Sequence, residues 1–319
     1  MRLFKIIAIS LGSLLILLAI GGYVFFKKAF QPKPNTLEVT EASGAIPITW
    51  GKSPQSDYAA LLLPVKIKGI PRTFYLQFDT GSPNTLLYKQ SMQSIQAKYP
   101  DQIAAIDSNS STINQTLQIG EMEIHSDQLQ LYERGEKPID WADSTRLKIG
   151  TLGADLIEKK LIVFDFKRQT CSFGNEILDC YPTIDFHELK FKLRKVLLPA
   201  EVAGKKRNLL HDSGTSGFEL ITNEKNWHKL ATPGAEGAEA FKVRSWKKQL
   251  TAYNIASNQP INFASTNVNL TQVTYIKGTS FMQRAGMRAT GLGGLIGNEL
   301  FMGKVLVLDC KNRKYGILD

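Results

Sequence analysis

An internal repeat that spans most of the chain constrains the fold more than any other feature. An apolar run ends in the sequence DTGS at residues 79–82, and a second apolar run ends in DSGT at residues 212–215. Each motif is followed by a second block, and these blocks, residues 152–167 and 296–311, align without a gap. Each begins with an apolar residue and a glycine and runs through a β-rich stretch to an aspartate. Such self-similarity predicts two halves with the same layout.

The segments between the repeated blocks predict a body made mostly of β-structure. Residues 116–124 and 267–275 alternate between apolar and polar side chains, and Gly120 interrupts the first of these runs. Alternation with turn residues is typical of half-buried strands joined as hairpins. Helical patterns are short and cover only residues 89–99 and 223–230. We therefore expect a mostly-β protein with two short helices in the body.

The paired motifs resemble those of the pepsin-like and retropepsin-like aspartic peptidases, from about residue 46 to the end of the chain. The resemblance implies two pseudo-symmetric β-barrel lobes in one chain, an N-terminal lobe at residues 46–182 and a C-terminal lobe at residues 183–319. It also implies that Asp79 and Asp212 form the catalytic pair. A retropepsin-style homodimer needs one motif per chain. Because this chain carries two, we expect an intramolecular pair and a monomeric catalytic unit.

A pair of neighbouring carboxyl groups can supply both halves of acid–base catalysis. Two carboxyl groups in contact do not both ionise readily, so they hold one proton between them. The ionised partner can take a proton from water while the protonated partner donates to the substrate carbonyl. The pair titrates as a unit. This chemistry predicts peptide-bond hydrolysis without a cofactor or a metal ion.

The resemblance also assigns supporting roles to the residues beside the two aspartates. The glycines of both motifs would permit tight turns and close approach of the two loops. The hydroxyl groups of Thr80 and Ser213 would bond across to the opposite loop, and those of Ser82 and Thr215 would bond the outer carboxylate oxygens. Gly153 and Gly297 would pack beside the active-site loops. The full set of expected supporting residues is Thr80, Gly81, Ser82, Ser213, Gly214 and Thr215.

Two features depart from the family pattern. The pepsin-like flap carries a tyrosine beside a glycine, whereas the nearest hairpin turn here, residues 119–122, has none, and the setting of Tyr132 does not match. His211 replaces a usually apolar residue directly before Asp212. Because side chains alternate faces along a strand, we expect His211 to point away from the pair. The alternative is that it tunes the pH range of the pair.

The N-terminal segment predicts a membrane anchor. Residues 6–26 form an uncharged apolar run closed by Lys27 and Lys28, and about 20 such residues span a bilayer as a helix. The run is long for a cleaved signal peptide and lacks a good cleavage site, so an uncleaved signal anchor at residues 1–26 is favoured over a removed signal. Residues 27–45 would then be a linker. With the whole body behind the helix, we expect the catalytic body outside the cytoplasm, on the periplasmic or extracellular side.

Charge and cysteine content exclude several other classes of function. The formal net charge of +10 comes from scattered lysines and arginines with no basic–aromatic stripe, so nucleic acid is not expected as a partner. A solvated basic surface is the simplest interpretation, and attraction to anionic lipid or an acidic substrate is the alternative. The four histidines and three cysteines fall into no ligand spacing, which argues against a zinc site. Cys171 and Cys180 could form a disulfide, and Cys310 is expected to be a buried thiol.

These patterns together predict a membrane-anchored aspartic endopeptidase that acts on a peptide or protein substrate. One alternative is a catalytically silent relative that binds peptide or carbohydrate in the same cleft. Another is a membrane-tethered structural protein that uses the β body as a scaffold. Retention of both aspartates and their hydroxyl neighbours favours the active enzyme, although a fold alone does not fix a function.

Overall fold

The computed structural model describes residues 21–22, 31–40, 42–143, 145–177, 181, 183–235, 237–245, 248–278 and 292–319. The chain divides into two compact units, Met1–Pro34 and Asn35–Asp319. In the first unit, Gly21 and Gly22 are helical. The rest of the predicted anchor at residues 6–26 lies outside the described residues. Within the described part of the chain, no helix is both long and apolar enough to cross a membrane.

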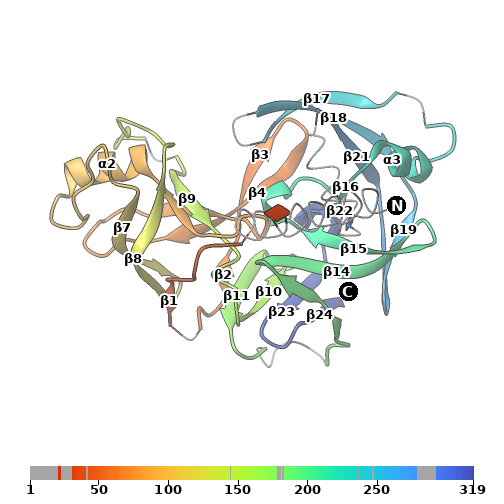
Figure 1. The fold of residues 1–319 in the computed structure, drawn as a ribbon, viewed down its shortest axis with the longest axis horizontal. Coiled ribbons are helices and arrows are strands. Elements are labelled where there is room, and N and C mark those ends of the chain that lie inside the picture. The colour runs from red at the N-terminus through yellow and green to blue at the C-terminus, as the bar shows by residue number, and fades with distance from the viewer. Residues whose placement is uncertain are drawn as a thin grey trace, which may run out of the picture. The chain divides into compact units, whose positions relative to one another are not determined.

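The second unit is mostly β-structure, as the sequence predicts, and its described strands form three sheets (Figure 1). The amino-half sheet has the order β1-β8-β6-β9-β5-β4-β3, with β7 also paired to β8. Its strands are β1 (Glu38–Val39), β3 (Thr49–Ser53), β4 (Ser56–Val65), β5 (Phe74–Phe78), β6 (Leu86–Tyr88), β7 (Thr112–Ile119), β8 (Met122–Tyr132) and β9 (Lys148–Leu152).

A carboxy-half sheet is built from the second half of the chain. Its order is β17-β18-β21-β16-β22-β15-β14-β19-β20, with β13 also paired to β14. Its strands are β13 (Lys190–Lys192), β14 (Lys195–Val202), β15 (Lys205–His211), β16 (Leu220–Thr222), β17 (Glu239–Ser245), β18 (Lys248–Ala256), β19 (Pro260–Phe263), β20 (Thr266–Asn269), β21 (Gln272–Lys277) and β22 (Leu292–Ile296).

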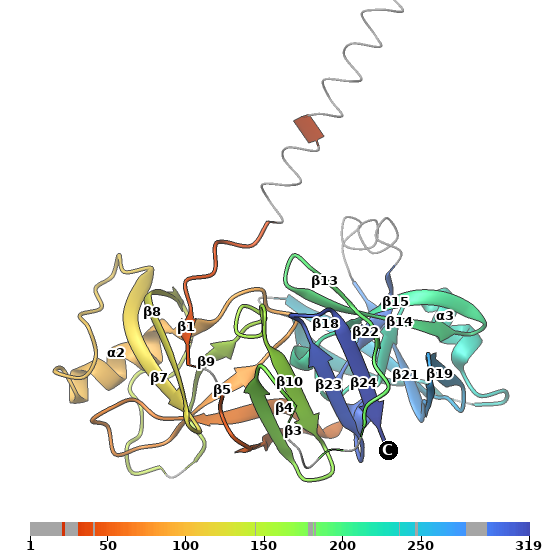
Figure 2. The same ribbon diagram turned by 90° about the horizontal axis from the view of Figure 1, so that it is seen from below.

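The third sheet, here called the central sheet, takes strands from both halves. Its order is β12-β24-β23-β10-β11-β2. Figure 2 shows the green strands of the first half beside the blue strands of the second. Its strands are β2 (Ile46–Pro47), β10 (Leu161–Asp165), β11 (Thr170–Gly174), β12 (His187–Glu188), β23 (Val305–Asp309) and β24 (Lys314–Leu318).

Local sequence signals place the short helices correctly. Helix α2 (Lys89–Lys98) and helix α3 (Glu224–Leu230) fall where the patterns predict them. Asn223 caps α3, because its side chain accepts a hydrogen bond from the Asn226 amide. Two 3₁₀ turns, η1 (Ser213–Thr215) and η2 (Asn298–Phe301), complete the helical elements of the described body.

Both segments contain the predicted strands, but only the first forms a hairpin with itself. Residues 116–124 lie in the β7–β8 hairpin, with its turn at Gly120. Residues 267–275 do not form a hairpin, because β20 pairs with β19 while β21 pairs with β18 and β16. The physical reason is Glu219, whose carboxylate accepts hydrogen bonds from the amides of Thr271 and Gln272 and so ends the run between the two strands.

The two halves repeat the same unusual strand pairing. Strand β5 runs parallel to β9 and β15 runs parallel to β22, and each pair has an irregularity near its start. Strands β6 and β16 then pair antiparallel to β9 and β22. Since β5 and β15 end at the residues before Asp79 and Asp212, equivalent strands present the two aspartates.

The central sheet joins the halves through equivalent strands. β10 and β23 pair antiparallel, and Val163 lies opposite Val307, its counterpart in the repeat. Both strands are buried along their whole length. Ile162 and Phe164 face the large core, while Val163 and Val307 belong to a smaller cluster on the opposite face. A sheet covered on both faces explains why these stretches are apolar at nearly every position.

The cysteine expectations are tested in part. Cys171 and Cys310 are both buried, and burial raises the pKa of each thiol. Cys310 therefore packs as a small apolar side chain, as predicted. Cys180 lies outside the described residues, but Cys171 is a free thiol, so it does not form the disulfide that the spacing left open.

Arg194 ties the second half of the body to the first. It lies in the two-residue turn between β13 and β14, where both Leu193 and Arg194 have positive φ angles. Its buried guanidinium contacts Glu158 at 3.0 Å and donates to the Pro83 carbonyl and the Asn84 side chain. Pro83 and Asn84 directly follow the DTGS motif, so this contact braces the loop that carries Asp79.

We predict that Arg194→Met lowers the free energy of unfolding by about 2–3 kcal/mol, because it removes the charge-assisted bonds of a buried guanidinium and leaves Glu158, among the described residues, with only its hydrogen bond from Asn35. Chemical denaturation of the full-length protein measures this. Lys205→Met, at an exposed position in another hairpin, is the control and should change stability by less than about 0.5 kcal/mol. Equal stability of the two variants would contradict the bracing role.

Candidate active site

The structure brings Asp79 and Asp212 together, although they are far apart in sequence. Their carboxyl groups are close enough to share a hydrogen bond. Each aspartate is half-buried and begins a tight turn after its strand. The pairing therefore follows from the meeting of the two equivalent turns.

Glycine is required at the third position of each motif. A side chain on Gly81 would collide with the carboxylate of Asp212, and one on Gly214 would collide with the carboxylate of Asp79. Neither glycine has a positive φ angle, so the requirement is close approach and not backbone strain. The two aspartates and two glycines thus interlock across the junction of the halves.

A reciprocal set of hydrogen bonds fixes the two turns against each other. The Thr80 amide donates to Ser213 Oγ at 2.9 Å, and the Ser213 amide donates to Thr80 Oγ1 at 3.0 Å. Each hydroxyl group then donates to a carbonyl on the opposite strand, Thr80 to His211 and Ser213 to Phe78, both at 2.9 Å. Thr80 and Ser213 are fully buried. These are the cross-loop bonds that the family resemblance implies.

Backbone amides hold the carboxylates in place. Asp79 Oδ1 accepts from the amides of Gly81 at 2.9 Å and Ser82 at 3.0 Å, and Asp212 Oδ1 accepts from the Gly214 amide at 3.0 Å. The expected roles of the Ser82 and Thr215 hydroxyl groups are wrong. Ser82 Oγ donates to the Asn84 carbonyl and Thr215 Oγ1 donates to the Asp212 carbonyl. Both hydroxyl groups close their own turns instead of bonding the carboxylates.

The surroundings of the pair favour one retained proton. Burial raises the pKa of Asp212 to about 7, and the negative charge of Asp79 adds to the shift. Burial also raises the pKa of Asp79, against the lowering effect of the Ser82 and Gly81 amides. Two half-buried carboxyls in contact therefore share a proton in mildly acidic solution. This is the protonation state that combined acid and base catalysis needs.

Gly153 and Gly297 pack against the two turns, as expected. A side chain on Gly153 would collide with the backbone of Asn84, and one on Gly297 would collide with the carbonyls of Thr215 and Phe218. The repeated glycine thus lets β9 and β22 lie directly behind the loops that carry the aspartates.

His211 points away from the pair, as the strand alternation predicts. It is fully buried, with its ring near those of Phe164 and Phe301, and its Nδ1 lies 3.3 Å from Thr80 Oγ1. Burial lowers the pKa of His211 to about 4, so the ring is neutral at neutral pH. Its contact with Thr80 supports the cross-loop bonds. Its effect on the pH range of the pair stays a prediction.

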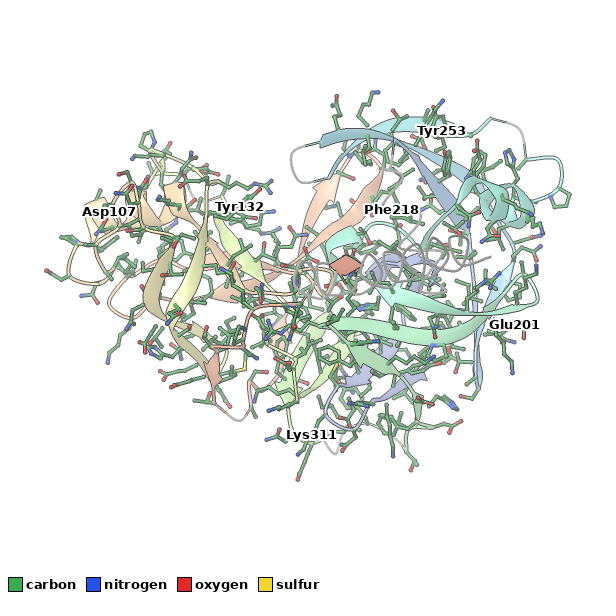
Figure 3. The ribbon with its side chains drawn as sticks, in the orientation of Figure 1. Asp107, Tyr132, Glu201, Phe218, Tyr253 and Lys311 are labelled. Atoms are coloured by element: carbon green, nitrogen blue, oxygen red, sulfur yellow. The ribbon has the colours of Figure 1, made fainter. Side chains whose placement is uncertain are left out.

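The hairpin turn considered as a flap lies elsewhere. Ile119 and Met122 are fully buried, and Gly120 lies against Ser43 and Ile46. The β3–β4 hairpin lies against the loop that follows the DSGT motif, because a side chain on Gly217 would collide with Ser56. The β17–β18 hairpin of the second half also contacts this loop. Its Phe241 stacks on Phe218 with ring centroids 6.3 Å apart. Phe218 lies three residues after the DSGT motif and is labelled in Figure 3 together with Tyr253 of β18.

Sequence reasoning missed two ionisable residues: Lys148, whose charge acts on Asp79, and Glu299, whose amide donates to the Ser216 carbonyl just after the DSGT motif. Lys148 Nζ donates to Gln77 Oε1 at 3.0 Å, and its positive charge lowers the pKa of Asp79. Glu299 accepts from Ser56 Oγ at 3.2 Å, and burial raises its pKa to about 7. Lys148 begins the strand that leads to Gly153, and Glu299 lies two residues after Gly297. The short sequence distance of each residue from a repeated glycine was the signal that could have found them.

No group of three or more His, Cys, Asp or Glu side chains within the described residues is arranged to hold a metal ion. A scan against known protein families finds none that matches the chain, and a search of curated proteins finds no relative.

We predict that Asp212→Asn stabilises the protein at pH 8 by about 2 kcal/mol and has little effect near pH 4. The folded-state pKa of Asp212 is raised, so the protonated carboxyl contributes stability below the unfolded pKa of about 4. That contribution is lost as pH rises through about 7, and asparagine avoids the loss while still accepting from Gly214. We expect somewhat less than the full shift because the carboxyl keeps contact with solvent. Thermal unfolding against pH measures this, and a variant that is less stable at pH 8 would contradict it.

Proposed function

We propose that the protein is a membrane-anchored aspartic endopeptidase that hydrolyses peptide bonds with a water molecule activated by Asp79 and Asp212. The observation that carries the proposal is the reciprocal bonding of Thr80 and Ser213, which holds two carboxyl groups in contact. A structural protein has no need for two half-buried carboxyls in contact, whose mutual repulsion destabilises the fold. Perturbed, clustered carboxyls favour an acid–base site.

The proposal extends to the organisation of the chain. The repeated strand pairings support two pseudo-symmetric β-barrel lobes of the pepsin-like and retropepsin-like kind, at residues 46–182 and 183–319. Each lobe supplies one aspartate, so a single chain suffices for catalysis. The segment at residues 1–26, with its apolar run at residues 6–26, would anchor this body outside the cytoplasm, with residues 27–45 as a linker.

The arrangement permits a complete reaction without a covalent intermediate. The ionised carboxylate takes a proton from water, whose oxygen attacks the carbonyl carbon of the peptide, while the protonated carboxyl donates to the carbonyl oxygen. The tetrahedral intermediate then breaks its C–N bond as a proton moves to the leaving nitrogen. The products are a carboxylic acid and an amine, and the pair again holds one proton.

We predict that Asp79→Asn and Asp212→Asn each lower peptide cleavage by at least about 10³-fold, because removing either member leaves the pair without its acid or its base. The full-length wild type and both variants would be incubated with a diverse peptide library, with and without a statine-type transition-state analogue. Lys311→Met, at an exposed turn residue, is the control.

Activity should also be lost as pH rises through about 7, because the shared proton then leaves. Normal turnover by either asparagine variant, or inhibition by a chelator, would contradict the proposed mechanism. Peptide binding by a folded wild type that cleaves nothing would instead support the silent, peptide-binding alternative.

A further inference from the structure

Two side chains of β5 lie on the same face of the strand as Asp79, and the more distant of them lines a separate cavity. Tyr75 and Gln77 are the half-buried residues of the strand, and Asp79 continues their alternation. Gln77 lies about 7 Å and Tyr75 about 13 Å from Asp79 along the strand. Tyr75 lines a cavity of about 520 Å³. One face of the amino-half sheet therefore connects the carboxyl pair with this cavity.

Positively charged side chains lie along the same face of the sheet, between Asp79 and the cavity. Lys148 lies opposite Tyr75 in the pairing of β5 and β9 and bonds Gln77, which places its ammonium group between Tyr75 and Asp79. Burial lowers the pKa of Lys148, and the neighbouring positive charge of Arg134 lowers it further. The negative charge of Asp79 opposes both effects, and a further anion between Lys148 and Arg134 would stabilise their charged forms more.

The cavity itself is both basic and aromatic. Lys98 Nζ lies 4.2 Å from the ring centroid of Trp141, and the Arg72 guanidinium lies 5.5 Å from the same centroid. Tyr99 packs edge-on against Trp141, and Arg146 completes the positive lining. Asp143 also lines the cavity, but its carboxylate accepts hydrogen bonds from Thr145.

None of these cations forms a salt bridge in the part of the chain that the structure describes, although the charge of Arg72 lowers the pKa of Asp143 and that of Lys148 lowers the pKa of Asp79. The salt bridges found there all involve other basic residues. Arg72 donates to three backbone carbonyls, and Arg146 donates to the Trp50 carbonyl. These contacts fix the positions of the guanidinium groups without neutralising their charge. The cations of this path that form no salt bridge in the described residues are Arg72, Lys98, Arg134, Arg146 and Lys148.

We propose that this basic path selects acidic peptides, with Lys148 binding a carboxylate side chain near the scissile bond and the Trp141 cavity binding a further acidic residue. The inference rests on the proposed peptidase function and specifies its substrate class. Charge-assisted bonds to carboxylates are the strong, selective contacts that such groups offer. The chain's net charge of +10 acts in the same direction, by attracting acidic substrates.

The test uses the full-length protein and sets of quenched fluorescent peptides that differ at one position, occupied by Glu, Gln or Lys. For the wild type we expect kcat/KM to be about tenfold higher with Glu than with Gln at a position near the scissile bond, and lower again with Lys. In Lys148→Met this ratio should fall toward one, and in Lys148→Glu it should reverse. Lys98→Met should lower the preference only at a more distant position. Lys311→Met is the matched control and should keep the wild-type ratio.

Equal kcat/KM for the Glu, Gln and Lys peptides, or a preference that Lys148→Met leaves intact, would overturn the inference while leaving the peptidase function standing. If no peptide is cleaved, calorimetric binding of the same peptides to Asp212→Asn decides the matter separately. If the Glu peptide binds, and its binding weakens with added salt and with Lys148→Met, the preference of the basic path for acidic peptides is supported even though the peptidase proposal fails. Equal binding of the Glu, Gln and Lys peptides would contradict the preference for acidic peptides as well.

Discussion

The reciprocal bonds between Thr80 and Ser213 are the interaction on which the rest of the site depends. Each residue donates its amide to the hydroxyl group of the other, and each hydroxyl group then donates to a strand carbonyl of the opposite half. Every donor in this buried set therefore has a partner, which is the condition under which a buried polar network stabilises a fold. The bonds offset the repulsion of two carboxyls in contact.

Because of this geometry, the site forms only when both halves of the body come together. Asp79 and Asp212 follow equivalent strands, and the central sheet joins those halves through Val163 and Val307. Arg194 braces the first aspartate loop from the second half of the chain. Neither half can assemble the pair alone, because each supplies one carboxyl and one side of every cross-loop bond. The basic path from Lys148 to Trp141, in contrast, belongs entirely to the first half.

Patterns that repeat or act locally could be read from the sequence. The repeated motifs indicated that Asp79 and Asp212 act together, and periodicity placed α2 and α3. The sequence did not predict the contacts that depend on the direction of a side chain or on a partner far away in the chain. The hydroxyl groups of Ser82 and Thr215 donate to carbonyls of their own turns, because a hydroxyl group can rotate toward any nearby acceptor.

Long-range contacts explain the other differences from the predictions. Alternation at residues 267–275 suggested a hairpin, but Glu219, far away in sequence, binds the amides between the two strands. Lys148 and Arg194 looked like ordinary surface cations, since no periodicity marks a basic residue that meets its partners only in the folded chain. The sequence alone therefore predicts the type of site better than the groups that surround it.

The central claim is that Asp79 and Asp212 share one proton, and infrared difference spectroscopy tests it most directly. The carbonyl stretch of a protonated carboxylic acid would be followed from pH 4 to pH 9 in the wild type, Asp212→Asn and Asp79→Asn. The account predicts that the wild type keeps one buried protonated carboxyl at pH 6 and loses it as pH rises through about 7. Both variants should lack this band. A wild-type spectrum at pH 6 that matches the spectra of the variants would contradict the shared proton and the mechanism built on it.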